Sequence, residues 1–270
     1  MQTFIPYVVV AFIYIAVAAD FWRGNKPNAP TFKLHSAILA LGLVVHGWLL
    51  YQGIFGDTLN GSFNLGFYYA LSAILWITVL IYWLADLEHE LHSLQAFVLP
   101  PAAICALLPA FFNSSYFLPA DVSGLFVAHI AIALLAYSLF TFAALHALLM
   151  YFAEASLHNK PSPLKLLDFP PLMVMESLLF KVIGLGFVLL TITVLSGMLF
   201  SEQIFKQPLQ FNHKTIFSIA SWLIYGGLLY GRFKFGWRGK KAIRWTLIGF
   251  ALLLLAYVGS KFILEVLLQR

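Results

Sequence analysis

Charged side chains are scarce in this chain. Asp, Glu, Lys and Arg make up 10% of its 270 residues, whereas a soluble domain carries about 25%. Hydrophobic residues make up 61%, and the mean hydropathy is +0.88. These values exclude an ordinary soluble protein and predict an integral membrane protein. We therefore interpret the net charge of +5 as the excess of Lys and Arg that membrane proteins carry in their cytoplasmic loops, and we expect no nucleic-acid partner.

Cysteine is nearly absent as well. The one cysteine, Cys105, excludes an internal disulfide and a thiol pair, so a Cys-x-x-Cys redox or haem-attachment motif is missing. A cleavable signal peptide is not expected either, because no basic residue precedes the first apolar run, at residues 4–19. We expect that run to remain as the first membrane span.

Long apolar runs dominate what is present. A spanning helix needs about 20 mainly apolar residues, and eight runs fit: residues 4–20, 35–52, 66–85, 92–112, 123–152, 177–200, 213–231 and 244–265. We therefore predict an all-α, polytopic membrane helix bundle that forms a single domain over residues 1–270. Pro100 and Pro101 interrupt the fourth run. The fifth run is longer than a bilayer requires, which predicts a helix that tilts or projects.

The distribution of basic residues predicts the orientation. Short loops rich in Lys and Arg stay cytoplasmic, and the basic-rich loops are those after the first, fifth and seventh spans. An even number of spans then places both termini outside. The basic run at residues 232–244 is interpreted as the anchor that holds the seventh loop inside. Binding of anionic lipid or of a cytosolic protein is the alternative.

This topology sorts the eight histidines by depth. Those at the cytoplasmic edge, expected to be solvated, are His35, His89, His92 and His158, and His146 lies in the inner half of the fifth span. The outer half holds the other three: His46, His129 and His213. With a rise of about 1.5 Å per residue, His46 and His129 each lie about six residues, or roughly 9 Å, below the outer membrane edge.

Three imidazoles in one layer suggest a ligand site, although each could instead be a neutral histidine bonded to a carbonyl or hydroxyl group. Zinc usually takes further Cys, His, Asp or Glu ligands, and the acids of this layer are Asp57, Asp121 and Glu202. Haem needs only one or two axial imidazoles and a large apolar slot, which a chain with 17% aromatic residues can supply. His46, His129 and His213 are therefore candidate haem-iron ligands.

Aromatic and small residues permit two interpretations each. Trp48 and Tyr51, together with Phe205 and Phe211, either line a pocket or belong to the interfacial aromatic belt. Gly227 and Gly231 match the small-xxx-small pattern, which ordinary helix packing explains.

Three stretches carry a family resemblance: HIAIALLAYSLFTFAALHALLMYF, KVIGLGFVLLTITVLSGMLF and SWLIYGGLLYGRFKFGWRGKKAIRWTLIGFALLLLAYVGSKFILE. Together they resemble the cytochrome c assembly family of haem-handling membrane proteins, the CcsA/CcmC/HemX superfamily. The chain is most similar to its short, eight-span YpjD/HemX-like branch, over residues 40–268. The resemblance implies a multi-pass protein of the bacterial inner membrane that takes part in cytochrome c-type biogenesis.

The resemblance also implies roles for individual residues. His129, followed by LLAYS, matches the family's external haem ligand, and His46, with Asn64 downstream, resembles the histidine assigned to a transmembrane haem. Other family features have no counterpart: MLFSEQIFKQPLQFNHKT stands in place of the tryptophan-rich motif, and the histidines expected near the end of the next-to-last span and after the last span are missing. His213, at the position of the motif's Asp-Pro-Lys, is then a substitute ligand.

Three functions follow as hypotheses. In the first, the chain binds haem, with haem b as the candidate cofactor, at an outward-facing site, and Lys214, Trp48 and Tyr51 contact the propionates or the ring. Its partners would be cytochrome c maturation proteins or a haem-synthesis enzyme, besides membrane lipid, and it would not be an enzyme. In the second, it is a HemX-like regulator or scaffold whose basic inner loop is the contact surface. The third is a small transporter.

Overall fold

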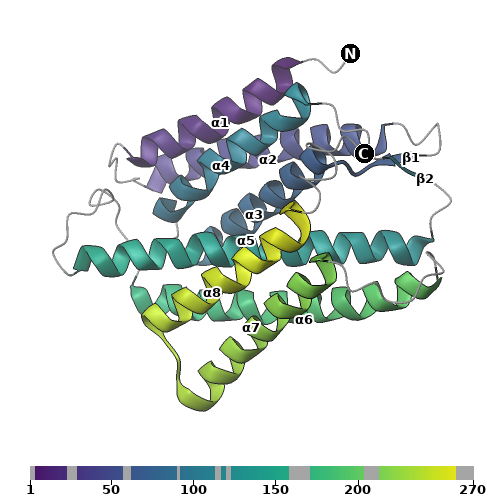
Figure 1. Ribbon diagram of the computed structural model, residues 1–270. Helices are drawn as coiled ribbons and strands as arrows, with labels where there is room; N and C mark the ends of the chain where they lie inside the picture. Colours follow the sequence, from purple (N-terminus) through teal and green to yellow (C-terminus); the bar gives the residue numbers. More distant parts are fainter. Residues whose placement is uncertain are drawn as a thin grey trace. The chain divides into compact units, whose positions relative to one another are not determined.

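The computed structural model describes residues 4–22, 29–56, 62–89, 92–112, 117–119, 123–157, 171–203 and 213–259 (Figure 1). Within these residues the chain forms eight α-helices: α1 (Phe4–Trp22), α2 (Ala29–Phe55), α3 (Phe67–His89), α4 (His92–Phe111), α5 (Gly124–Leu157), α6 (Leu172–Gln203), α7 (His213–Phe235) and α8 (Gly239–Leu254). A π-helical turn, η2 (Leu255–Gly259), follows α8. Each helix coincides with one predicted apolar run, so the all-α prediction is confirmed.

The lengths and compositions of the helices identify a polytopic membrane protein. Among the described residues, five helices are long and apolar enough to cross a membrane: α1, α2, α3, α5 and α6. The apolar part of α4 is shorter and spans Gln95–Phe111. The last turn of α7 carries two basic residues, Arg232 and Lys234. The 34 residues of α5 and the 32 of α6 correspond to about 50 Å each, against about 30 Å for a hydrocarbon core.

The proposed interruption of the fourth span is wrong. α4 continues through Pro100, Pro101 and Pro109. A proline inside a helix removes one intrahelical hydrogen bond and disfavours the helix, yet small side chains at Ala102, Ala103 and Ala106 are fully buried on this helix. Close packing on one side therefore holds α4 in a helical path that its sequence alone does not favour.

The described helices fall into two compact units, of which the first comprises residues 1–121 and 152–172. In this unit α1 packs against α2 and α4, and α3 packs against the same two helices, so that the four form a closed ring (Figure 1). Part of its core is built from Leu50, Tyr69 and Ala73. The indole of Trp76 donates to the carbonyl of Leu43 at 2.8 Å and fixes α3 on α2.

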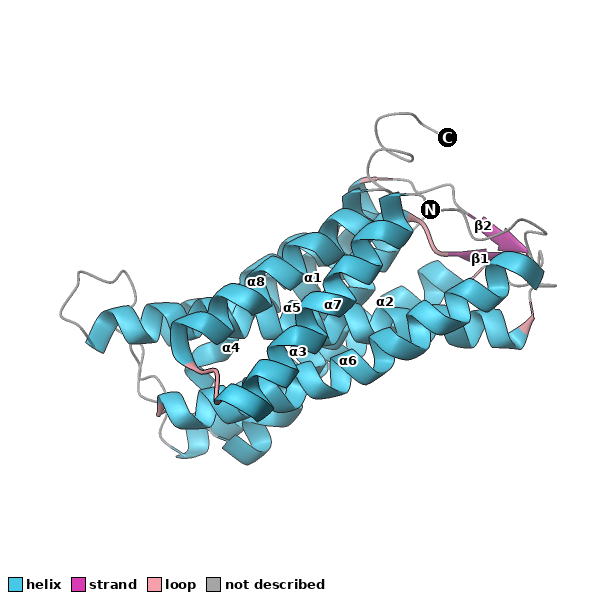
Figure 2. Ribbon diagram, turned by 60° about the horizontal axis from the view of Figure 1, so that its bottom comes forward, coloured by secondary structure: helices cyan, strands magenta, loops and turns pink. Residues whose placement is uncertain are grey.

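A small antiparallel ribbon accompanies these helices in the first unit. It consists of β1 (Ser62–Asn64) and β2 (Phe117–Pro119), drawn as the magenta arrows of Figure 2. Phe63 pairs with Leu118 at its centre. The side chain of Asn64 accepts a hydrogen bond from the backbone N–H of Gly66 at 3.2 Å, so Asn64 shapes the turn into α3. The sequence did not predict the ribbon, because three residues give no detectable alternation.

The second unit comprises residues 122–151 and 173–270. α5 and α6 run antiparallel, because the start of α5 meets the end of α6 at Ser196 while His146, farther along α5, meets Met175 near the start of α6. α7 and α8 form a hairpin joined by residues 236–238 (Figure 2). Gly236 and Gly239 have φ of 62° and 53°, values that side chains disfavour. They permit this short reversal.

Small residues let the α7–α8 hairpin close. A Cβ at Gly227 would lie 3.0 Å from Trp245 of α8, and one at Gly231 would collide with the indole of Trp237 in the connection. The small-xxx-small pattern is thus explained by helix packing, as predicted. A hydrogen bond of 2.8 Å from the Ser221 hydroxyl to the Gly249 carbonyl joins the two helices farther along.

We expect Gly231→Ala to lower stability by about 1–3 kcal/mol, because the added methyl must displace a packed indole. The matched control is Gly184→Ala in α6, where a Cβ meets nothing within 4 Å. There alanine should be neutral or stabilising by up to about 1 kcal/mol, through its higher helix propensity. Thermal unfolding in detergent measures both. Equal melting temperatures for the two variants would contradict this packing.

Candidate functional site

His129 lies in the second turn of α5 and is held by α6. Its Nδ1 is 2.7 Å from the hydroxyl oxygen of Ser196. That hydroxyl is itself 2.6 Å from the carbonyl oxygen of Ile192 and 3.3 Å from that of Thr193. A serine hydroxyl has one proton, and a backbone carbonyl can only accept. The serine therefore donates to its own helix and accepts from Nδ1–H of His129.

This arrangement fixes the neutral tautomer of the imidazole. With the proton on Nδ1, the other nitrogen, Nε2, carries the lone pair. Histidines that bind metals have this form, with the remote N–H donated to a second group that orients the ring. Phe126 also holds the imidazole of His129 in place, because the two rings stack with centroids 6.1 Å apart. At Gly197 a Cβ would lie 3.5 Å from Cε1 of His129, so the ring packs closely against α6.

Lys214 reaches the same end of the second unit from the first turn of α7. Its charge interacts with the His129 imidazole, and its Nζ lies 5.8 Å from the ring centroid of Tyr257 in η2. Tyr257 in turn packs on Tyr137, with centroids 5.3 Å apart. The exposed His213 precedes Lys214 as the first residue of α7. Lys214 and His129 thus lie at the same end of the second unit.

His46 has a different environment in the first unit. It is 1% exposed, with Nδ1 3.2 Å from the Tyr14 hydroxyl and Nε2 2.9 Å from the Ser72 hydroxyl. Both ring nitrogens therefore bind hydroxyl groups. Nine residues separate His46 from the end of α2 at Phe55, which is about 14 Å, so His46 lies deeper in its helix than the predicted six residues.

Trp48 and Tyr51 lie on the exposed side of α2. Their rings stack with centroids 5.9 Å apart, and Tyr51 also contacts Phe55 at 5.4 Å. All three side chains are exposed. An exposed aromatic row on an apolar helix is typical of lipid-facing residues near the membrane interface.

Two other histidines have structural partners. Nε2 of the buried His146 donates to the carbonyl of Met175 at 2.9 Å, which ties α5 to the first turn of α6. Nε2 of His35 lies 3.0 Å from the carboxylate of Asp20, and its ring packs on Phe21. His35 is therefore not the solvated residue that we predicted. His158 and the side chains of His89 and His92 lie outside the described residues.

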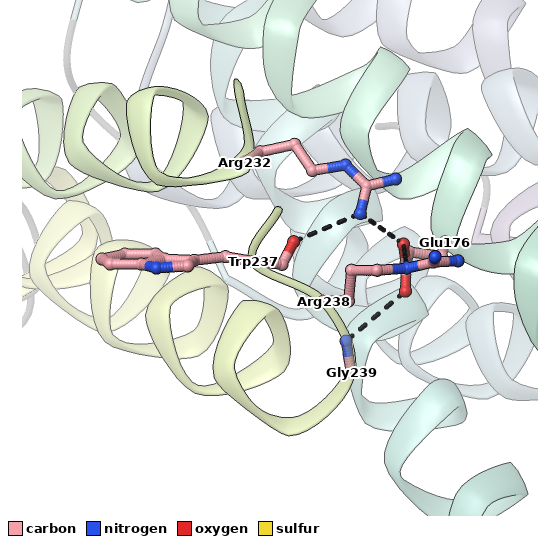
Figure 3. A network of polar contacts seen from close by, with 5 residues as sticks. All are labelled: Glu176, Arg232, Trp237, Arg238 and Gly239. Atoms are coloured by element: carbon pink, nitrogen blue, oxygen red, sulfur yellow. Dashed lines mark hydrogen bonds and ion pairs between the residues drawn. The ribbon is translucent and has the colours of Figure 1, made fainter. Parts of the chain in front are cut away.

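A buried carboxylate is the feature that the sequence did not reveal. Glu176, in the first turns of α6, binds three groups of the α7–α8 hairpin (Figure 3). Its Oε1 is 2.6 Å from a terminal nitrogen of Arg232 and 2.8 Å from Nε of Arg238, and its Oε2 is 3.4 Å from the backbone nitrogen of Gly239. Arg232 also donates to the carbonyl of Trp237 at 3.2 Å.

We refer to this group, Glu176 with Arg232, Arg238 and Gly239, as the Glu176 clamp. It adds a second role to the basic run at residues 232–244, which we interpreted as an anchor, because two of its arginines bind a carboxylate. Twenty residues of α6 separate Glu176 from Ser196, which is about 30 Å, the thickness of a hydrocarbon core. The Glu176 clamp and the His129 site thus lie at opposite ends of the second unit.

The described side chains do not form a multi-ligand metal site. Within the described ranges no group of three or more His, Cys, Asp and Glu side chains could hold an ion. A haem site requires less from the protein: one or two imidazoles and apolar walls. Exposed apolar side chains are present at the start of α5, the end of α6 and the start of α7, namely Leu125, Val127, Leu199 and Ile216. One imidazole and apolar side chains at these helix ends are compatible with haem.

Comparison with known proteins gives a consistent result. The model of the family described as cytochrome C assembly protein matches residues 34–268. The inner membrane protein YpjD of Escherichia coli K12 is 30% identical over 166 residues, which cover 62% of this chain and 62% of that protein, less than two thirds of its length. A 28.8 kDa protein of Azospirillum brasilense is 33% identical over 207 residues, covering 73% and 76%.

More distant similarity extends over more of the chain. The cytochrome c biogenesis protein CcsA of Prochlorococcus marinus AS9601 is 24% identical over 262 residues, covering 86% of this chain and 83% of that protein. No solved structure matches.

Proposed function

The chain belongs to the cytochrome c assembly protein family, and from that premise we propose that it binds haem through His129 at an outward-facing site. The observation that carries the proposal is the hydrogen bond from Nδ1–H of His129 to Ser196. It leaves the proton off Nε2 and holds the ring in place, which prepares Nε2 to bind iron. Haem b is the proposed form, because the single cysteine excludes a Cys-x-x-Cys attachment motif.

The neighbouring residues have distinct roles in this proposal. Lys214 would pair with a propionate, since it extends from the start of α7 at the same end of the second unit as His129. His213, the first residue of α7, would be a second histidine that holds the iron. We rank His46 below both, because its two ring nitrogens bind Tyr14 and Ser72. When bound, haem would supply an iron that accepts axial nitrogens and two carboxylates that a lysine can neutralise.

We infer the orientation of the second unit from the basic residues at its clamp end. Arg232, Lys234, Arg238, Lys240, Lys241 and Arg244 gather there, and loops rich in Lys and Arg face the cytoplasm. The His129 end then faces outward, as haem delivery to an external apocytochrome requires. We propose a bacterial inner membrane location, with cytochrome c maturation proteins or a haem-synthesis enzyme as partners. We assign no bond-breaking step to the chain.

A regulator or scaffold is the second candidate function. The observation that favours it is the exposure of basic and aromatic side chains on the α7–α8 hairpin, which could bind another protein. The third hypothesis, a transporter, predicts broken helices. The proline pair was the one helix break that the sequence suggested, and α4 continues through it, which weakens this hypothesis.

An absorption spectrum of the protein purified from haem-replete cells tests the proposal. We expect a Soret band with sharp reduced bands, as for low-spin haem with two axial nitrogens. His213→Ala should retain haem but convert much of it to a high-spin, five-coordinate spectrum. His35→Gln, a histidine change in the first unit, is the control and should leave the spectrum unchanged. A featureless spectrum of the wild type after haem supplementation would favour the regulatory function instead.

A further inference from the structure

The α7–α8 hairpin presents a positively charged surface that the Glu176 clamp does not neutralise. Besides Arg238 of the clamp, four basic side chains on it are exposed: Lys234, Lys240, Lys241 and Arg244. We refer to these four as the basic collar. The clamp holds two arginines on a single carboxylate, so it also retains a net positive charge. The collar and the clamp together therefore attract anions.

The collar continues into an apolar stripe that runs along α8 to the first residue of η2. Lys241 and Arg244 are three residues apart and share one face of the helix. Ile248, Ala251 and Leu255 follow at the same helical spacing and are also exposed. Cations in the first turns of a helix, above an exposed apolar face, match the boundary between headgroups and acyl chains. A soluble acidic partner would not require the apolar part.

Exposed aromatic residues lie on the same hairpin. Phe233 is 91% exposed, and Phe235 and Tyr230 are also exposed. The indole of Trp237 packs under Lys241, whose Nζ is 3.9 Å from the ring centroid. Aromatic rings are enriched at the membrane–water interface. They indicate that the collar lies at headgroup level and not far out in solution.

We propose that the basic collar is a binding site for anionic phospholipid headgroups on the face of the membrane where the hairpin lies. The phosphate and the remaining headgroup charge would bind between Lys241 and Arg244, while the acyl chains cover Ile248 and Leu255. The stable geometry of the Glu176 clamp would hold these cations in place. This site does not depend on haem binding, because the collar and His129 lie at opposite ends of the second unit.

Native mass spectrometry of the full chain in detergent tests the proposal, with phosphatidylglycerol and phosphatidylcholine as probes. The wild type should bind phosphatidylglycerol preferentially, and raising the ionic strength should weaken this preference. Each cation near an anionic surface contributes about fivefold to binding, so Lys241→Gln combined with Arg244→Gln should reduce the preference about thirtyfold. The control, Lys241→Arg with Arg244→Lys, keeps both charges and should keep most of the preference.

Three results would overturn the proposal. One is an unchanged preference in the glutamine double variant. Another is an equal loss in the charge-keeping control, which would assign the effect to packing. Thermal unfolding of each variant shows whether it is folded, and Lys234→Gln alone supplies a further exposed charge change if the double variant does not fold. Binding of free glycerol phosphate as tight as that of the lipid would likewise exclude a lipid site.

Discussion

His129→Ala is expected to abolish the Soret band of the purified protein while its helical content and elution volume stay unchanged. In the proposed site Nε2 of His129 would bind the iron, and the ring is half-buried near the start of α5 rather than in the core. Removing it deletes the ligand and one hydrogen bond to Ser196. Loss of one such partly exposed bond costs only about 1 kcal/mol of stability, so folding and haem binding should separate.

Ser196→Ala refines this prediction, because Ser196 would act through His129 and not on haem. Without the serine oxygen the Nδ1 proton has lost the acceptor that orients the ring. Loss of such an outer partner typically weakens metal binding by about ten- to a hundredfold. We therefore expect a retained but weaker haem complex and a shifted reduction potential. Thr193→Val is the control: it removes a hydroxyl that bonds the Leu189 carbonyl one turn away on α6.

The results that would contradict this site are specific. If His129→Ala bound haem with an unchanged spectrum, His129 would not be a ligand. If His46→Ala removed the haem and His129→Ala did not, the site would lie among α1, α2 and α3 in the first unit. Haem titration of each variant, with thermal unfolding as the check on folding, distinguishes these outcomes.

The sequence predicted the helices well and the contacts between them poorly. Apolar runs set the position of a membrane helix, so α1 to α8 each fell on a predicted run. Contacts depend on the register between helices, which an apolar run does not encode. The depth estimate placed His129 in the outer layer, yet nothing in the sequence indicated Ser196, which lies 67 positions away. The same limit applies to the hydroxyl partners of His46.

Interpretation by residue type failed where a polar group had a distant partner. His35 was expected in solvent because it lies at a membrane edge, but Asp20 on the neighbouring helix binds it. The arginines of the basic run were read by their charge and loop position alone. Their partner is 56 and 62 residues away, and one acid at the start of an apolar helix carries no sequence signal that it will meet them.

Glu176→Ala is expected to cause the largest loss of stability among the substitutions that leave His129 intact. The Glu176 side chain is 8% exposed, whereas Arg232 and Arg238 are 33% and 53% exposed. Removing one partner of a buried ion pair costs about 3–5 kcal/mol. Because water reaches both arginines and screens their charge, we expect about 2–3 kcal/mol. The backbone N–H of Gly239, in the first turn of α8, also loses an acceptor.

Two further variants show whether charge or shape is responsible. Glu176→Gln keeps the size of the side chain and one hydrogen-bond acceptor. It should therefore lose less stability than the alanine variant. Lys234→Gln changes an exposed charge on the same hairpin and should stay within about 0.5 kcal/mol of the wild type. In a double-mutant cycle, the variant with both Glu176→Gln and Arg232→Met should lose less stability than the sum of the losses in the two single variants. The reason is that the two side chains contact each other. Strict additivity in that cycle would show that Glu176 and Arg232 have no interaction energy with each other. The packing at Gly227 and Gly231 would then contribute more to holding the hairpin than this ion pair does.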